Sequence, residues 1–192
     1  MKYSIKQQIA MIFIAVMAGT IILCWFINNT FLYNYYEHDK KAVVQNAYER
    51  LNKAGKSEKL TSQEFQNEMG EYAFRHNLSV EVVNENAEVV FAATFNGAEL
   101  NRRLFGYITG IPIGVEGEES PKPNTVFKLR ELRTNTEYIE MYGQLDNGSW
   151  YIISSTMESI RDSVRLANRF LAWVGVVSIL VGCVVCLVIA RR

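Results

Sequence analysis

Two uncharged apolar runs stand near the ends of the chain. Residues 9–27 form a run of 19 without a charge, and residues 170–190 form a run of 21. At about 1.5 Å of rise per residue, a helix of either length matches a bilayer hydrocarbon core of about 30 Å. Neither run has the polar side that a helix packed on a soluble core carries. The pattern predicts two transmembrane helices, since a cleaved signal peptide would leave the apolar residues 21–27 unexplained.

Between the runs, the apolar positions first follow a helical period and then alternate. Helical spacing extends to Gly55, and a capping-box pattern from Thr61 to Glu64 opens a second helix. Alternating segments then predict five strands, and the turn residues 146–148 predict a hairpin between the last two. An antiparallel sheet with its helices gathered on one side makes this an α+β domain. The predicted strands are 78–82, 88–94, 126–132, 138–144 and 149–155, with a short helix or irregular connector at 98–105 and a loop at 106–125.

The helix that leaves this domain carries apolar residues at steps of three and four. The steps continue from the domain into the second apolar run without a break, which is the pattern of a coiled-coil seam. Packing of this helix on its own domain is the alternative, but such packing cannot continue inside a membrane. The spacing predicts that two copies form a homodimer along this helix, and that small helix shifts carry a signal. The residues are Met157, Ile160, Val164, Ala167, Leu171 and Val174.

Charge is balanced overall but not along the chain. Lys+Arg and Asp+Glu each number 20, so there is no basic excess to favour a nucleic-acid partner. Lys2, Lys6, Arg191 and Arg192 flank the apolar runs, which leaves 16 basic against 20 acidic residues between them. The positive-inside rule then places both termini in the cytoplasm. The predicted segments are a cytoplasmic N-terminus at 1–8, transmembrane helices at 9–27 and 170–190, an extracytoplasmic domain at 28–169 and a cytoplasmic linker that begins at 191–192.

All three cysteines, Cys24, Cys183 and Cys186, lie inside the apolar runs. The domain between the runs must therefore fold without disulfides, which favours a bacterial surface protein over a eukaryotic ectodomain. Cys183 and Cys186 have the spacing of a metal or redox pair, but charged thiolates are costly among lipid tails. We expect a two-pass protein of the bacterial plasma membrane.

The domain offers no pattern of catalytic residues. The motifs of serine hydrolases and zinc proteases do not occur, and no cysteine nucleophile lies outside the apolar runs. His38 stands between two acidic residues, but neighbours on a helix point in different directions. The acidic residues Glu116, Glu118 and Glu119 lack a calcium-loop spacing and are interpreted as a solvated loop. We therefore expect no catalytic residues, no metal site and no cofactor.

Three features of the chain are typical of one family. They are the short basic start at 1–8, the helix-then-sheet order between two spans, and the stretches GSWYIISSTMESIRDSV at 148–164 and ANRFL at 167–171. With them the chain resembles the input half of bacterial two-component sensor histidine kinases. The stretch at 148–164 is similar to the final sensor strand and exit helix of Gram-positive members, where a proline often stands at the position of Thr156. The resemblance covers the whole chain in layout and implies a PAS-like or Cache-like extracytoplasmic domain.

The catalytic half of such a kinase has no counterpart in these residues. In that family the second span leads into a HAMP linker, a helix with the phosphoacceptor histidine and an ATP-binding domain. His38 and His76 are the two histidines here, and neither stands in a phosphoacceptor motif. The resemblance implies that the full-length parent is a protein histidine kinase and that this chain is its sensing and signal-transmission module. The input domain of a chemoreceptor or a cyclic-dinucleotide enzyme, and a tethered protein that binds an envelope partner without signalling, remain as alternatives.

The connector between the second and third predicted strands lines the ligand cleft in PAS-like sensors, and here it contains two adjacent arginines. With three nearby tyrosines, these arginines could receive an anionic or amphipathic ligand. Surface arginines beside a structural aromatic core are the alternative interpretation. The candidate ligand residues are Arg102, Arg103, Tyr107, Tyr138 and Tyr142.

Overall fold

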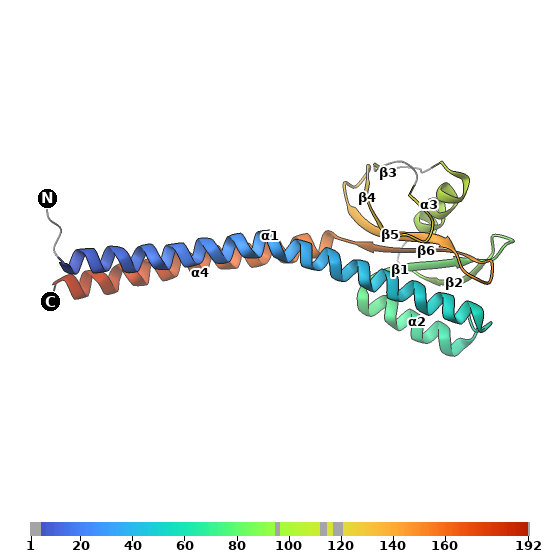
Figure 1. The fold of residues 1–192 in the computed structure, drawn as a ribbon, viewed down its shortest axis with the longest axis horizontal. Helices are drawn as coiled ribbons and strands as arrows, with labels where there is room; N and C mark the ends of the chain where they lie inside the picture. Colours follow the sequence, from blue (N-terminus) through green and yellow to red (C-terminus); the bar gives the residue numbers. More distant parts are fainter. Residues whose placement is uncertain (1–4, 95–96, 112–114, 117–120, 192) are drawn as a thin grey trace. The chain divides into compact units, whose positions relative to one another are not determined.

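The computed structural model describes residues 5–94, 97–111, 115–116 and 121–191, which form two compact units. Unit 2, Glu37–Glu158, is an α+β domain. Unit 1 consists of Met1–Tyr36 and Ser159–Arg192, and its described part belongs to the first and last helices of the chain (Figure 1). Residues 1–4 and 192, at the ends of the two predicted cytoplasmic segments, lie outside the described residues.

The helices of the described chain are α1 (Ile5–Lys56), α2 (Gln63–His76), α3 (Gly97–Thr109) and α4 (Glu158–Arg191). The N-cap of α2 is Ser62, whose Oγ accepts from the Phe65 backbone N–H at 3.4 Å. The capping-box expectation of Thr61 was therefore wrong by one residue. Asn77 closes α2 in the left-handed conformation, at φ 54°, which asparagine adopts more readily than most residues.

The strands form one antiparallel sheet in the order β2-β1-β6-β5-β4-β3. The five predicted strands are all present, and the additional strand β3 has only two residues at the edge. Gly148, at φ +89°, turns the chain between β5 and β6 as the sequence predicts. The strands are β1 (Leu78–Val83), β2 (Val89–Ala93), β3 (Val115–Glu116), β4 (Phe127–Glu131), β5 (Glu137–Gln144) and β6 (Trp150–Thr156).

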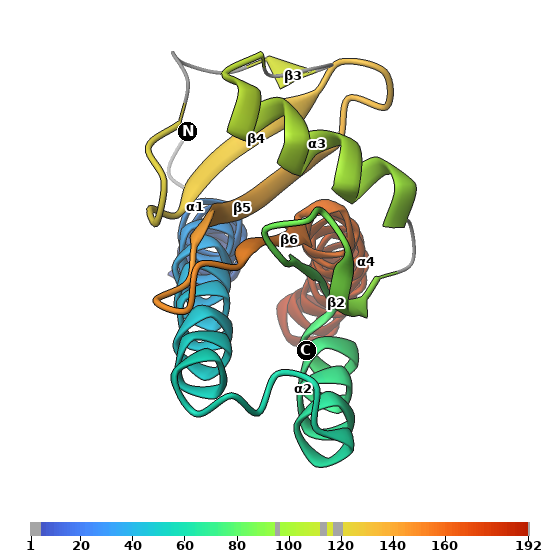
Figure 2. The same cartoon turned by 90° about the vertical axis from the view of Figure 1, so that its right-hand side faces the viewer.

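Helices cover both faces of this sheet, not one as expected from the sequence. One face packs against α2 and against the part of α1 that belongs to unit 2, and we call it the α1/α2 face. The opposite face packs against α3, and we call it the α3 face (Figure 2). The connector forms the 13-residue helix α3, which extends four residues into the predicted loop. Leu100, Leu104 and Tyr107 give α3 a buried stripe at helical spacing, so this helix is held by packing on the sheet.

In unit 1 one face of α4 packs against α1. Asn28 donates from Nδ2 to Asn168 Oδ1 at 2.6 Å. A Cβ added to Gly175 would lie 3.0 Å from Ile21 Cγ2, and Gly182 is similarly close to α1. Since Asn168, Gly175 and Gly182 stand seven residues apart, they share one helical face, and glycines let the two backbones approach. Both helices are long and apolar enough to cross a membrane.

Candidate ligand site

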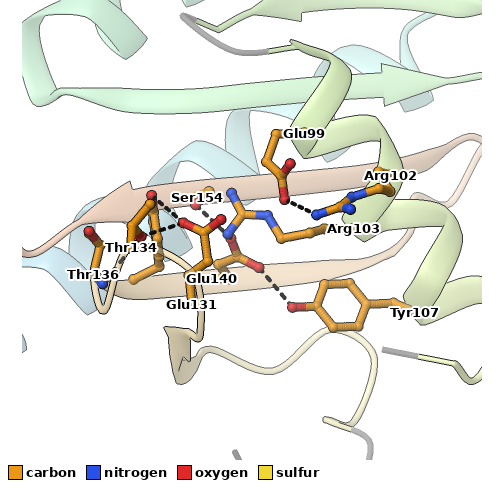
Figure 3. Close-up of polar contacts among 10 residues, drawn as sticks. Glu99, Arg102, Arg103, Tyr107, Glu131, Thr134, Thr136, Glu140 and Ser154 are labelled. Atoms are coloured by element: carbon orange, nitrogen blue, oxygen red, sulfur yellow. Dashed lines mark hydrogen bonds and ion pairs between the residues drawn. The ribbon is translucent and has the colours of Figure 1, made fainter. Parts of the chain in front are cut away.

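A carboxyl group lies fully buried on the α3 face of the sheet. Glu140 occupies the middle of β5 between Tyr138 and Tyr142, and alternation along the strand directs all three toward α3. Its Oε1 accepts from Ser154 Oγ at 2.7 Å, and its Oε2 accepts from Tyr107 Oη at 2.9 Å. Glu140 therefore joins β5, β6 and α3 through one side chain (Figure 3).

Arg103 of α3 forms an ion pair with Glu140 in this apolar setting. Its Nη1 lies 2.8 Å from Glu140 Oε1, and the Arg103 side chain is 7% exposed. The Arg103 guanidinium also lies over the Tyr138 ring, 4.6 Å from its centre. Apart from this ion pair, the buried Nε of Arg103 has no hydrogen-bond partner. An unsatisfied donor of this kind is rare in a protein interior, and it makes Arg103 the unusual group of the site.

Aromatic rings form the apolar side of the site. Tyr107 and Tyr142 stack with ring centres 4.6 Å apart, and Phe127 meets both rings edge-on. Burial and the neighbouring Glu140 carboxyl raise the pKa of Tyr107, so its hydroxyl stays protonated and donates. The stack fixes the end of α3 that carries Tyr107 against β4 and β5.

A pocket of about 280 Å³ opens beside the Arg103–Glu140 pair. Its volume is near the lower end for small-molecule sites. Arg103, Glu131 and Tyr138 line it together with hydroxyl groups from β1, β6 and the β4–β5 turn. Thr134 Oγ1 donates to Glu131 Oε2 at 2.6 Å, and Figure 3 shows the Glu131 carboxyl on the side of the Arg103 guanidinium. The remaining lining residues are Asn77, Ser79, Thr94, Glu99, Leu100, Arg133, Thr134, Ser154, Thr156 and Glu158.

A larger groove of about 890 Å³ runs between α1 and α2. Arg50 crosses it to pair with Glu68 at 2.8 Å, and its guanidinium lies over the Tyr72 ring. The Arg50 and Glu68 side chains are 46% and 65% exposed, so this pair is solvated and contributes little to stability. The groove lacks a buried ion pair such as Arg103–Glu140 on the α3 face, and we take the smaller pocket as the candidate site.

Four of the five predicted ligand residues, Arg103, Tyr107, Tyr138 and Tyr142, lie around Glu140. Arg103 and Tyr138 line the pocket, whereas Tyr107 and Tyr142 are buried and are not among its lining residues. Arg102 does not join them. Its side chain is half exposed and pairs with Glu99 one turn away on α3, because consecutive helix residues point about 100° apart.

Glu140 and Ser154 were not predicted, although a sequence signal existed for the first. In 138–142 the sequence places a glutamate two residues from a tyrosine on each side, so all three share one face of a strand. An acid on an otherwise aromatic strand face needs a cationic or hydrogen-bonding partner. Arg103 was the available partner on the connector.

The other predicted positions lie apart from this pocket. Met157 is fully buried in unit 2, Ala167 and Leu171 are half-buried, and Val174 is 43% exposed. The side chains of Ile160 and Val164, like Glu118 and Glu119 of the acidic loop, lie outside those described. Among the described residues, no cluster of three His, Cys, Asp or Glu side chains could hold a metal ion.

Burial raises the pKa of Glu140 above its ordinary value of 4.5, outweighing the attraction of Arg103 and the bonds from Ser154 and Tyr107. The folded domain then binds a proton at this group more tightly than the unfolded chain does. Stability from Glu140 is therefore present below pH 4.5 and falls as pH rises through the folded-state pKa. We expect the stability difference between wild type and Glu140→Gln, measured by urea unfolding, to decrease from pH 4.5 to pH 8. A difference that grows with pH would contradict this direction.

Comparisons with protein-family models, curated proteins and solved structures found no match to this chain.

Proposed function

We propose that this chain is the extracytoplasmic sensing and transmembrane signal-transmission module of a two-component sensor histidine kinase. The observation that carries the proposal is the Arg103–Glu140 pair, buried beside a pocket in a domain whose chain continues at both ends into an apolar helix. A domain that only tethers has no need of a buried ion pair with an unsatisfied Nε–H, because burying these polar groups costs stability.

The ligand we propose is a small anionic or amphipathic molecule. Arg103 supports this choice, because it lines the pocket and its Nε–H is a donor without a protein partner. The Tyr138 ring, which lines the pocket under the Arg103 guanidinium, offers apolar surface beside the charge. Glu131 limits the choice, since a purely anionic ligand would be repelled by its carboxylate unless the ligand also presents a donor.

Transmission in this proposal follows the chain from the pocket to the second span. Ser154, which binds Glu140, belongs to β6, and β6 ends at Thr156 only two residues before α4 begins. A ligand that changes the Arg103–Glu140 contact would thus act on the strand that leads into α4. It can bias two arrangements of α4 only by binding them unequally. The proposal places both termini in the cytoplasm and two copies side by side.

The test is a fusion of residues 1–192 to the HAMP linker and catalytic core of a histidine kinase. We expect the paired change Arg103→Met with Glu140→Gln to alter autophosphorylation at least threefold, because it removes the charge pair without leaving one charge alone. Arg102→Met serves as the control, since it removes a neighbouring exposed arginine of the same helix. Equal output from the wild-type fusion and both variants, at equal membrane levels, would favour the hypothesis of a membrane-tethered protein that does not signal.

A further inference from the structure

The segment 121–125 connects the two faces of the sheet, and we call it the cross-sheet strap. On the α3 face, Tyr142 Oη donates to the Pro121 carbonyl at 2.5 Å. On the α1/α2 face, Tyr151 Oη donates to Asn124 Oδ1 at 2.8 Å. The Asn124 backbone N–H donates to the Tyr142 carbonyl at 2.7 Å, which fixes the strap to β5. Two tyrosines on opposite faces of the sheet are therefore bound to one five-residue segment.

The register of the sheet explains how one segment reaches both faces. Tyr142 pairs with Ile152 and Gly143 pairs with Tyr151, so Tyr142 and Tyr151 point to opposite sides of neighbouring strands. The pairing of β4 with β5 ends at Phe127 and Glu140, which leaves the edge of β5 free beyond that point. The strap runs along this free edge and can contact side chains above and below it.

Gly143 leaves the space that Asn124 of the strap occupies beside β5. A Cβ at residue 143 would lie only 2.0 Å from Asn124 Oδ1 and 2.8 Å from Asn124 Cγ. The Asn124 amide thus occupies the space in which any other residue would put its side chain. Asn124 itself adopts φ +58°, a left-handed conformation that asparagine tolerates better than most residues. Both residues suit a close contact that a generic loop on a sheet edge would not need.

Ring contacts extend this connection in both directions. Tyr142 stacks on Tyr107, whose hydroxyl binds Glu140 of the candidate site. Tyr151 is fully buried, and its ring centre lies 5.2 Å from that of Tyr48 on α1. On one side the strap therefore touches the aromatic part of the ligand site, and on the other it touches a residue packed on the first helix.

We propose that Asn124 is a positioning residue that couples the Tyr107–Tyr142 stack to helix α1 through Tyr151 and Tyr48. The coupling rests on the proposed sensor function for its purpose, but it is a property of the domain in the absence of any ligand or kinase. It gives the site a second route to the membrane helices, through α1, besides the route from β6 into α4. The coupling between the two ends of this route is measurable as a double-mutant coupling energy.

The experiment is a double-mutant cycle read by amide hydrogen exchange on the full chain 1–192 in lipid nanodiscs. Tyr142→Phe removes the bond to Pro121 and keeps the ring on Tyr107. We expect it to raise exchange at α1 amides 44–52, on the opposite face, at least fivefold. In an Asn124→Ala background the same change should raise α1 exchange less than twofold, while exchange in α3 still rises.

Tyr151→Phe removes the same hydrogen bond to Asn124 but leaves the sequence of the strap unchanged. It deletes one hydroxyl and keeps the buried ring. It should abolish the α1 response to Tyr142→Phe as Asn124→Ala does, and it guards against a strap variant that fails to fold. Lys122→Ala, an exposed change within the strap, should leave the response intact. An α1 response that is absent in wild type, or equal in all backgrounds, would overturn the coupling. Either result would leave the kinase-fusion test of the sensor function unaffected.

Discussion

Replacing Arg103 by methionine should lower the free energy of unfolding of the α+β domain by about 3–5 kcal/mol, the usual cost of removing one partner from a buried ion pair. The reason is Glu140, which is fully buried and loses its ion pair with the Arg103 guanidinium. At neutral pH the remaining carboxyl must stay ionised in an apolar site or take up a proton. Either cost appears as lost stability.

Two variants make this expectation specific to the buried charge. Arg103→Met combined with Glu140→Gln should recover most of the loss, since an uncharged amide can still bind Ser154 and Tyr107. Arg102→Met removes the adjacent arginine, which is half exposed and paired with Glu99, and should cost less than about 0.5 kcal/mol. Urea unfolding of the full chain in nanodiscs, followed by near-ultraviolet circular dichroism, measures all three. An Arg103→Met loss as small as that of Arg102→Met would contradict the assignment of a buried pair.

The two adjacent arginines show where sequence reasoning reaches its limit. Both carry the same charge in the same connector, and residue type alone does not separate them, because the pattern at 98–105 is compatible with a short helix or an irregular connector. Once α3 is known to run from Gly97 to Thr109, its period places Arg103 on the stripe of Leu100 and Tyr107 and turns Arg102 outward. The site could be predicted from residue type, but the choice between neighbours required the helical phase.

The strands of the sheet could be predicted more fully than the helices that cover its two faces. Alternating or apolar segments and the turns between them predict β1, β2, β4, β5 and β6. The structure adds that β1, β5 and β6 are buried on both faces, because the sheet has a layer on each side. The helical layer formed by α3 is not predicted, because the glycine at position 106 is typical of the start of a loop. Gly106 is buried in the helix, so packing on the sheet outweighs its low helix propensity. Strand β3 has two residues, too few for any alternation.

Helix α4 carries two adjacent stripes, and this changes how a dimer can form along it. The stripe of Asn168, Gly175 and Gly182 faces α1 within the chain, as the Asn28 hydrogen bond and the close glycines show. Val174 and Val181, on the neighbouring stripe, are 43% and 57% exposed. Met157 is buried in unit 2, so it belongs to the domain core. If two copies meet, the contact must use the exposed stripe beyond Leu171.

We therefore expect a cysteine at Val174 to form disulfide-linked dimers of the full chain in membranes, with at least five times the yield of a cysteine at Val176. The two positions are similarly exposed, at 43% and 52%, and stand at nearly the same depth. They point about 160° apart around α4, since each residue turns the helix by about 100°. The native cysteines, Cys24, Cys183 and Cys186, must first be replaced by serine in both variants.

The same stripe should control output if the helix carries the signal. In the kinase fusion, Val174→Ser should change autophosphorylation, because a polar group on a contact between spans alters the packing of one copy on the other. Val176→Ser introduces the same group at the same depth toward lipid and should leave output within twofold of wild type. Equal crosslinking at positions 174 and 176, together with equal output from the two serine variants, would exclude a phased contact between copies. The signal would then have to pass through the α1–α4 pair of a single copy, where Asn28 and Asn168 already join the two helices.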